Sequence, residues 1–419
     1  MSAANDIHPA DARGGAEIAA AGGVLTVDLG AVAANWRGVR AAAPGAEAGA
    51  VVKADAYGLG MAPVARRLAE EGCGCFFVAD ANEGAALRAL LPGVTIYVLN
   101  GLFPGAGVLY REAGLAPCLA SMAEVAEWRD TAKRAGTQLP AALHFDSGLN
   151  RLGMSAADAA ALAADAALAE GLDVRLIMSH LACADDAANP RNAEQLRRFR
   201  EMQAVLAKRF PGARASLANS PGVFLGPDYH FDLVRPGVGL YGGNPLTGAA
   251  NPFRPAVKVE ARVLAVRTLE AGDAVGYGAT WAAAAPARIA VLAAGYADGY
   301  FRALSYPRPG DMRDNGGEED NPAEKGQVYG GQVHIAGYTV PVAGRISMDM
   351  MAVDVSAVPE GAIQRGDMAE LIGPHISVDD VGLRAGTIGY EILTSLGRRY
   401  MRRYLTGDEN LSGKPGGQV

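Results

Sequence analysis

The middle of the chain alternates between short apolar runs and longer, alanine-rich stretches with helical spacing. Between residues 50 and 240, apolar runs that suit buried strands recur, and helical segments such as 62–72 and 193–210 lie between most of them. Strands that are apolar throughout and alternate with helices are typical of a parallel sheet covered on both faces. The pattern therefore predicts an α/β fold, a (β/α)8 TIM-type barrel. The predicted strands are 50–54, 75–80, 94–100, 115–120, 141–146, 175–180, 215–220 and 232–240.

After residue 251 the pattern changes to strand-like segments that are separated by turn residues. Runs such as 257–266 and 288–296 predict a second, mainly antiparallel β domain that follows the barrel. The stretch 382–405 favours helix, so we expect this domain to have a helical end. Ahead of the barrel, 24–30 is predicted as a strand, which could pair with the C-terminal domain, and 31–40 as a helix.

These patterns predict four regions. We expect a disordered extension at 1–22, a barrel domain at 23–252, a β domain at 253–405 and a disordered tail at 406–419. Within the β domain, the polar segment 307–326 is predicted to be an exposed insertion loop.

Composition argues against several classes of protein. The chain has 419 residues, of which 50% are hydrophobic, and its net charge is −7. No basic stripe is visible, which argues against nucleic acid as a partner. No apolar run approaches the roughly 20 residues of a membrane span, and no secretory signal is recognisable at the N-terminus. The four cysteines fit no zinc spacing and suit small buried thiols, so we expect a cytoplasmic protein without a metal site.

Residues with useful chemistry gather at the carboxyl ends of the predicted barrel strands, where active sites of this fold lie. Three of them have a plain structural alternative. Lys53 could end a strand with its amine in solvent, His180 could be an ordinary core histidine, and Arg235 could pair with Asp232. The residues at or just after strand ends are Lys53, Asp146, Arg151, His180, Asn219, Ser220, Arg235 and Gly237.

Two segments near the last predicted strands suit a phosphate group. In 218–223, Ser220 can cap the following helix and Pro221 suits its first turn, and exposed N–H groups at a helix start bind phosphate. In 236–242, Gly237 and Gly239 permit close backbone approach, although glycine turns are common without a ligand. Phosphate loops near a desolvated lysine suggest pyridoxal 5'-phosphate as cofactor.

Arg235 would then modify the cofactor's chemistry. A guanidinium stays charged and only donates hydrogen bonds, so beside the pyridine nitrogen it would oppose protonation of the ring. Such a site suits simple proton exchange at the α-carbon of an amino acid and suppresses side reactions.

Segments in the right order along 24–405 resemble the alanine racemase family of fold-type III pyridoxal phosphate enzymes. They are VVKADAYGLG (51–60), DSGLNRLG (146–153), MSHLACAD (178–185), LANSPG (217–222), VRPGVGLYG (234–242), VGYGATW (275–281), AGYADGY (294–300), GRISMDM (344–350) and GYEILTSLG (389–397). The resemblance implies a barrel followed by a β domain and a head-to-tail homodimer with shared active sites.

The resemblance also implies roles for individual residues. Lys53 would bind the cofactor covalently and act as one base, Tyr277 of the other subunit would be the opposite base, and His180 beside Arg235 would help to relay the proton. Arg151 and Met348 would meet the substrate carboxylate. Phosphate and cofactor contacts would come from Tyr57, Asn219, Ser220, Gly237, Val238 and Tyr390, and an entrance corridor from Tyr296, Arg345 and Asp349.

This chain departs from the family pattern at two positions. His144 stands where many relatives have a lysine that is often carbamylated, so Arg151 needs another partner. Ser347 stands where some relatives have cysteine.

The expected activity is the interconversion of L-alanine and D-alanine, which would supply peptidoglycan synthesis or feed alanine catabolism. A racemase for serine, lysine or a broad set of amino acids is the alternative within the family. A cofactor carrier protein would lack the second domain, and a decarboxylase of this fold should lack the combination of Arg235 and Tyr277.

Overall fold

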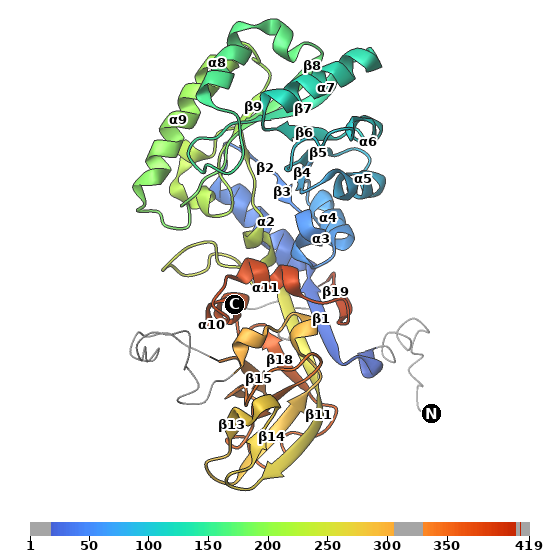
Figure 1. The fold of residues 1–419 in the computed structure, drawn as a ribbon, viewed down its shortest axis with the longest axis vertical. Helices are drawn as coiled ribbons and strands as arrows, with labels where there is room; N and C mark the ends of the chain where they lie inside the picture. Colours follow the sequence, from blue (N-terminus) through green and yellow to red (C-terminus); the bar gives the residue numbers. More distant parts are fainter. Residues whose placement is uncertain (1–17, 306–329, 408–410, 412–419) are drawn as a thin grey trace, which may run out of the picture. The chain divides into compact units, whose positions relative to one another are not determined.

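The computed structural model describes residues 18–305, 330–407 and 411 (Figure 1). The described chain divides into two compact units, one formed by 31–254 and the other by 18–30 together with 255–411. The predicted insertion at 307–326 lies outside the described residues, as do most of the predicted N-terminal extension and C-terminal tail.

The first unit contains a parallel sheet whose strands follow one another in chain order. Each strand pairs with the next in parallel register, and most strand residues are buried. The strands are β3 (Ala50–Val51), β4 (Cys75–Val78), β5 (Thr95–Val98), β6 (Ala116–Leu119), β7 (Leu139–His144), β8 (Leu172–Met178) and β9 (Arg214–Ser216).

An eighth strand closes this sheet into a ring. Strand β10 (Leu233–Val234) pairs in parallel with β2 (Glu47–Ala48), which runs on through Gly49 into β3. On the other side, a parallel bridge joins Asn219 to Arg235, just after β9 and β10. The backbone N–H of Val51 also donates to Pro236 O at 2.9 Å. The predicted (β/α)8 barrel is therefore confirmed.

Helices lie between the barrel strands and carry the local signals that start and stop helices. Asp80, Ser121 and Ser155 cap α5, α7 and α8 with their side chains, and Gly136 ends α7 in the left-handed region at φ 63°. The helices of this part are α2 (Leu29–Ala42), α4 (Met61–Glu70), α5 (Ala81–Leu90), α6 (Gly107–Glu112), α7 (Met122–Ala135), α8 (Ala156–Ala164) and α9 (Pro190–Ala207).

The second unit is built on a mainly antiparallel sheet, as predicted. The strand order is β16-β15-β18-β11-β1-β19, and β14 pairs with both β11 and β17. The strands are β1 (Gly23–Asp28), β11 (Val257–Leu269), β14 (Ala287–Leu292), β15 (Gln332–Ile335), β16 (Tyr338–Pro341), β17 (Met351–Asp354), β18 (Met368–Ile372) and β19 (Met401–Leu405). Strand β1 therefore belongs to this sheet, where it runs antiparallel to β11 and parallel to β19.

The helical end predicted at 382–405 is wrong in its last part. Helices α10 (Val378–Arg384) and α11 (Gly389–Ser395) form, but 401–405 is the strand β19. Its backbone pairs with β1 from Val24↔Met401 to Asp28↔Leu405, which satisfies an edge of β1 that would otherwise lack partners. Helix-forming residues such as Met401 and Arg402 adopt strand geometry here because this tertiary pairing outweighs local propensity.

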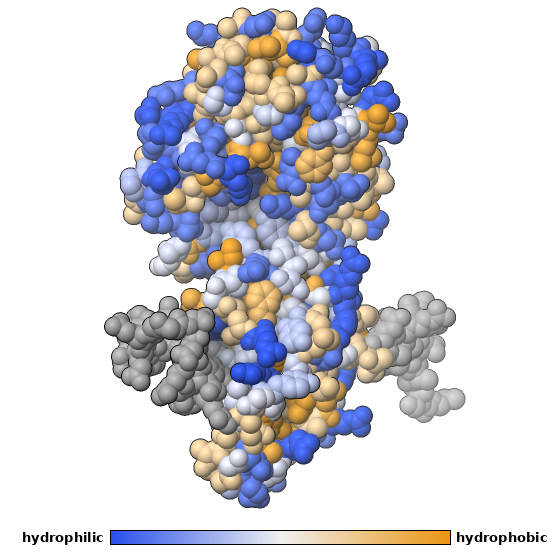
Figure 2. Space-filling view, viewed as in Figure 1, coloured by the Kyte–Doolittle hydropathy of each residue, from blue (hydrophilic) through white to orange (hydrophobic). Residues whose placement is uncertain are grey.

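Short elements and loops complete both units. They are the helical turns α3 (Lys53–Tyr57), η1 (Ala166–Ala169), η2 (Pro221–Leu225), η3 (Pro227–Tyr229), η4 (Val238–Tyr241), η5 (Tyr277–Ala279), η6 (Tyr296–Asp298) and η7 (Arg302–Leu304), and the hairpin strands β12 (Ala274–Val275) and β13 (Trp281–Ala282). On the visible face of each unit, hydrophilic and hydrophobic residues are interspersed (Figure 2). Among the described residues, no helix is long and apolar enough to cross a membrane.

Candidate active site

Lys53 lies slightly further along the chain than predicted. Strand β3 ends at Val51, and Lys53 is the first residue of the short turn α3. Its side chain is half-buried at the mouth of the barrel. Burial lowers the pKa of the Lys53 amine, and the nearby positive charge of Arg151 lowers it further. The structure therefore favours the pocket lysine over a lysine whose amine simply reaches solvent.

The turn after Lys53 has an unusual backbone. Four consecutive residues, 54–57, adopt left-handed φ angles between 53° and 56°, although none of them is glycine. The turn is held from both sides: Glu83 Oε1 accepts the Ala54 N–H at 2.6 Å, and Asp55 Oδ1 accepts the Met61 N–H at 2.6 Å. Sequence reasoning missed the role of Glu83, whose only signal is its place in the first turn of α5.

Tyr57, at the end of this turn, lies against the glycine segment that follows β10. A Cβ added to Gly237 would lie 2.3 Å from the Tyr57 Oη, so the hydroxyl rests directly on the glycine backbone. The ring packs 4.8 Å from that of Tyr241, whose own hydroxyl donates to Val51 O at 2.8 Å. The left-handed turn thus places the Tyr57 hydroxyl against the predicted phosphate loop.

Ser220 faces the same loop and has a different role from the predicted helix cap. Its hydroxyl accepts the N–H groups of Gly237 at 2.8 Å and Gly239 at 3.4 Å, and it makes no capping bond to η2. The cap comes from Asn219, whose Oδ1 accepts the Gly222 N–H at 3.1 Å. Backbone N–H groups that converge on one oxygen form a cradle that also suits a phosphate oxygen. Val238 begins η4 inside this cradle.

Arg235 is almost completely buried and has no acidic partner. Its guanidinium donates to Ser179 O at 2.6 Å, Leu217 O at 3.4 Å and Ser216 Oγ. The alternative pairing with Asp232 is wrong, because that carboxylate accepts the Ala215 N–H at 2.7 Å, and no carboxylate of the described residues forms an ion pair with Arg235. Burial lowers the pKa of Arg235 to about 10, so the group stays charged at neutral pH.

His180 lies beside this guanidinium. An Arg235 terminal nitrogen lies 3.4 Å from His180 Nδ1. Burial and the charges of Arg235 and Arg151 hold the pKa of His180 well below its usual range. The imidazole is therefore neutral, and its Nδ1 lone pair can accept from the arginine. Sequence reasoning missed Ser179 and Ser216, which fix the arginine; their signal is a hydroxyl placed in or beside an apolar strand.

The loop 146–153 after β7 positions Arg151. Asp146 Oδ1 accepts the N–H groups of Gly148 at 2.8 Å and Leu149 at 2.9 Å, so the carboxylate is used to fold its own loop. Arg151 is exposed, and its charge influences the pKa of Lys53, His144 and His180 alike. The site residues predicted in the barrel therefore come together around its mouth.

His144 is the buried imidazole at the end of β7. Its Nδ1 is enclosed and makes no hydrogen bond within the described part of the chain. Burial lowers the pKa of His144 to about 4, and Arg235 and Arg151 act in the same direction. His144 is thus a neutral group next to two permanent cations.

The barrel residues fit pyridoxal phosphate. Ser220 and the Gly237 and Gly239 N–H groups would hold the phosphate, with Tyr57 alongside, and the Lys53 amine would hold the aldehyde carbon. Arg235 is held by three neutral oxygens, so no carboxylate neutralises its charge, and this charge is available to a bound cofactor. The donor set therefore suits an anionic, phosphorylated aldehyde.

The second unit brings most of the remaining candidates together on adjoining loops. Tyr277 is 69% exposed and stands between two glycines with left-handed φ angles, of which Gly278 packs against Arg345. A Cβ on Gly278 would lie 2.9 Å from Arg345 Nη1. The sharp turn at 276–278 therefore holds the phenol away from its own unit.

Met348 and Tyr296 lie on two further loops that are hydrogen-bonded to each other. The Tyr296 N–H donates to Ser347 O at 3.0 Å, and the Ala297 N–H donates to Met348 O at 3.1 Å. Both side chains are exposed, at 53% for Met348 and 40% for Tyr296. The predicted carboxylate contact and one predicted corridor residue are therefore neighbours.

Asp349 directly follows Met348 on the same loop, whereas Tyr390 lies on the helix α11. Asp349 is exposed and forms an ion pair with Arg399 at 2.6 Å, and the same arginine binds the buried Asp298. Tyr390 is half-buried on α11. Its predicted phosphate contact stays a prediction.

Comparisons with known proteins cover both units. Residues 27–245 match the family model described as alanine racemase, N-terminal domain, and residues 256–404 match alanine racemase, C-terminal domain. The catabolic alanine racemase of Mesorhizobium japonicum is 45% identical over 93% of this chain and 95% of its own length. The biosynthetic alanine racemase of Agrobacterium fabrum is also 45% identical, over 92% of this chain and 94% of its own.

A solved structure gives the same picture. The alanine racemase from Bartonella henselae, described with covalently bound pyridoxal phosphate, is 37% identical and covers 92% of this chain and all of its own, with a TM-score of 0.82. Both halves of the chain thus match one family in order and nearly in full. The chain therefore belongs to the alanine racemase family of pyridoxal phosphate-dependent isomerases.

Proposed function

We propose that this enzyme interconverts L-alanine and D-alanine with two bases, Lys53 and Tyr277 of the partner subunit, on opposite faces of the substrate. The observation that carries the proposal is the half-buried Lys53 amine at the barrel mouth that also holds the backbone phosphate cradle. Burial and the positive charge of Arg151 lower the pKa of this amine. A lowered pKa increases the fraction of the neutral amine, which is the form of lysine that acts as a base.

Bound pyridoxal phosphate would supply an electron sink that acidifies the α-hydrogen of an attached amino acid. Lys53 would then remove or return that proton on one face. Arg151 would attract the substrate carboxylate, which is the anion that its exposed guanidinium suits. Arg235 would remain charged beside the ring nitrogen and, as a pure donor, would keep the nitrogen unprotonated. His180, neutral and next to Arg235, would help to move the second proton.

The second base requires another chain. Tyr277 is exposed and held outward by its glycine turn, and Met348 is exposed on the loop that contacts Tyr296. Large exposed side chains of this kind on one unit are typical of a surface that meets a partner. We propose a homodimer in which each C-terminal unit completes the barrel site of the other subunit, with Tyr296, Arg345 and Asp349 at the entrance.

The biological role is also proposed. Relatives of equal identity are named as catabolic and as biosynthetic alanine racemases, so D-alanine supply for peptidoglycan and alanine catabolism are both compatible with the chain. A cytoplasmic location fits either role.

Isotope exchange tests the reaction directly. Purified holoenzyme is incubated with L-alanine in deuterated water while the enantiomers and deuterium at the α-carbon are followed, with L-serine and L-lysine in parallel. Fast deuterium uptake with both enantiomers from alanine alone is the expected result. Equal rates with serine or lysine would replace alanine by a broad substrate range. The absence of exchange with cofactor bound would overturn the proposed function.

A further inference from the structure

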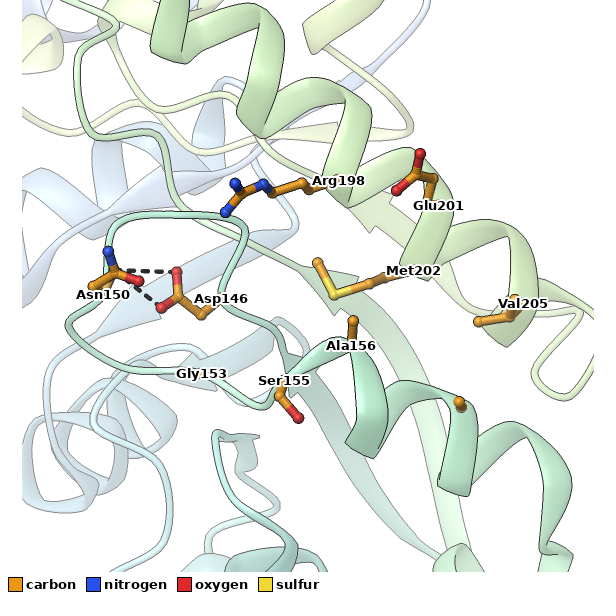
Figure 3. A pocket seen from close by; sticks show the side chains of 10 residues that line it. Asp146, Asn150, Gly153, Ser155, Ala156, Arg198, Glu201, Met202 and Val205 are labelled. Atoms are coloured by element: carbon orange, nitrogen blue, oxygen red, sulfur yellow. Dashed lines mark hydrogen bonds between the residues drawn. The ribbon is translucent and has the colours of Figure 1, made fainter.

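A groove on the outside of the barrel contains none of the residues proposed for catalysis in its lining. It lies between helices α8 and α9 and the loop 146–153, and its volume is about 630 Å³ (Figure 3). Ala156 and Ala160 from α8 and Met202 and Val205 from α9 form its apolar lining. This volume is within the range of small-molecule sites in proteins.

Three polar groups at the rim have unused hydrogen-bonding capacity. Arg198 is bound only through Nε, to Glu194 at 2.7 Å, so its two terminal nitrogens have no partner among residues 18–305 and 330–407. Glu201 uses one carboxylate oxygen for Arg197 at 2.7 Å, and the other has no partner in the same part of the chain. The Asn150 side-chain amide makes no hydrogen bond to the described residues either.

These groups are arranged with opposite charges over an apolar floor. Arg198 and Glu201 are three residues apart on α9, so their side chains emerge from the same face of the helix. In Figure 3 the Arg198 guanidinium extends toward the loop that carries Asn150, and Glu201 lies on α9 between Arg198 and Val205. A guanidinium with a free fork binds a carboxylate, and a free carboxylate oxygen binds an ammonium group.

We propose that this groove binds an α-amino acid with an aliphatic side chain as an effector. Arg198 and Asn150 take the α-carboxylate, Glu201 takes the α-ammonium group, and Met202 and Val205 contact the side chain. A second hollow of about 390 Å³ shares Asn150 and Arg198 in its lining.

The groove is connected to the active site through the loop itself. Asn150 precedes Arg151 in sequence and has a left-handed φ of 57°. Gly153, also in the lining, has a φ of 131° and sits so tightly that a Cβ would lie 2.5 Å from Asp146 N. A ligand that binds the Asn150 side chain therefore shifts Arg151, because the tightly packed loop can adjust its backbone in few other ways. We expect an altered KM for alanine with little change in kcat.

Calorimetry on the holoenzyme tests binding, with L-leucine as the probe. We expect saturable binding that Arg198→Gln weakens by about tenfold or more. Arg200→Gln is the matched control, because Arg200 lies on the same helix but outside the groove lining and pairs with Asp228. L-leucinol and isovalerate, which lack one charge each, should bind more weakly. No saturable binding, or equal weakening by both variants, would overturn the proposal.

A second pair of variants tests the groove by adding a large side chain without changing charge. One variant fills the groove, and the other is its control. Ala160→Tyr should abolish leucine binding, whereas Ala157→Tyr on the exposed, non-lining side of α8 should not. Binding in the groove does not depend on the proposed function, and only the kinetic readout rests on it. Leucine should change the KM for alanine in wild type and not in Ala160→Tyr. Simple competition that persists in Ala160→Tyr would place leucine in the active site and reject the effector site.

Discussion

Several site residues could be named from the sequence, but their partners could not. The apolar run before Lys53 and the polar strand ends indicated Lys53, His180, Ser220 and Arg235, and the structure brings them together. The sequence did not show that Ser220 accepts backbone N–H groups instead of capping a helix. It also did not show that Arg235 is satisfied by neutral oxygens. Both facts depend on which strand ends are neighbours, and local patterns do not contain that information.

The closeness of Tyr57 to Gly237 gives a first prediction. A Cβ added to Gly237 would lie 2.3 Å from the Tyr57 hydroxyl. Gly237→Ala should therefore displace Tyr57 and weaken pyridoxal phosphate binding by about tenfold or more. A fluorescence titration of the apoenzyme with cofactor measures this.

The control for this variant is Gly38→Ala, where nothing lies within 4 Å of the added Cβ. It should bind cofactor as wild type does. Unchanged affinity in Gly237→Ala would mean that Tyr57 is not part of the cradle.

The buried imidazole of His144 gives a second prediction, about stability and pH. Its pKa is about 4 in the folded protein and near the ordinary 6.5 in the unfolded chain. As the pH falls from 6.5 to 4, only the unfolded chain takes up this proton, so the free energy of unfolding falls. The loss reaches about 3 kcal/mol for this one residue, and His180 acts in the same direction.

Urea unfolding at pH 8 and pH 4.5 tests this effect. His144→Asn lacks the titrating group, so it should lose less stability than wild type over the same interval. Parallel losses in the two proteins would show that His144 is protonated in the folded state.

At the scale of elements, the hydrophobic pattern identified the barrel strands and failed at one end of the β sheet. Alternation of apolar runs and helices was enough for β4 to β9, because a parallel strand buried on both faces is apolar throughout. Residues 401–405 carry no such pattern, and only the pairing with β1 makes them a strand. The preference for helix over 382–405 was therefore correct for α10 and α11 and wrong for β19.

The place of β1 in the second sheet leads to a third prediction. Leu25 is fully buried on β1, between β11 and β19. Leu25→Ala should lower the free energy of unfolding of this unit by about 3 kcal/mol through the cavity it leaves. Hydrogen exchange read by mass spectrometry should show faster exchange in 257–263 and 401–405.

The barrel provides the comparison for this variant. Leu143 on β7 is equally buried, and Leu143→Ala should speed exchange in the barrel strands instead. Faster exchange in the barrel alone after Leu25→Ala would contradict the assignment of β1 to the second unit.

At the scale of the whole molecule, the sequence predicted two kinds of architecture in one chain. In the structure the boundary between the two units lies after residue 254, close to the predicted boundary at 252. The segment before residue 31, however, belongs to the second unit and not to the barrel. No pattern within 23–30 distinguishes an added barrel strand from a strand of the second sheet. Only the register with Ala261 to Val257 on β11 decides it.

The proposed sharing of each site between two subunits gives a fourth prediction, subunit complementation. Lys53→Ala and Tyr277→Phe should each be nearly inactive alone. If sites are shared, a heterodimer of the two variants has one doubly altered site and one intact site. Full exchange should restore about one quarter of wild-type activity, since half of the dimers are mixed and half of their sites are intact.

Mixing must be followed by mass spectrometry to show that exchange occurred. The control is a pair of Lys53→Ala preparations, which should stay inactive when mixed. Proven heterodimers without activity would place Lys53 and Tyr277 of the same chain in one site.

The left-handed turn after Lys53 has a consequence for mirror-image chemistry. Each L-residue in that region costs roughly 1–2 kcal/mol, whereas for a D-residue the same backbone angles are the relaxed ones. Ala54 is exposed in this turn, with a φ of 53°. A semisynthetic enzyme with D-alanine at position 54 should therefore be more stable than the natural one. The proposed product of the enzyme is thus a building block that this turn accepts more readily than the L-alanine it contains.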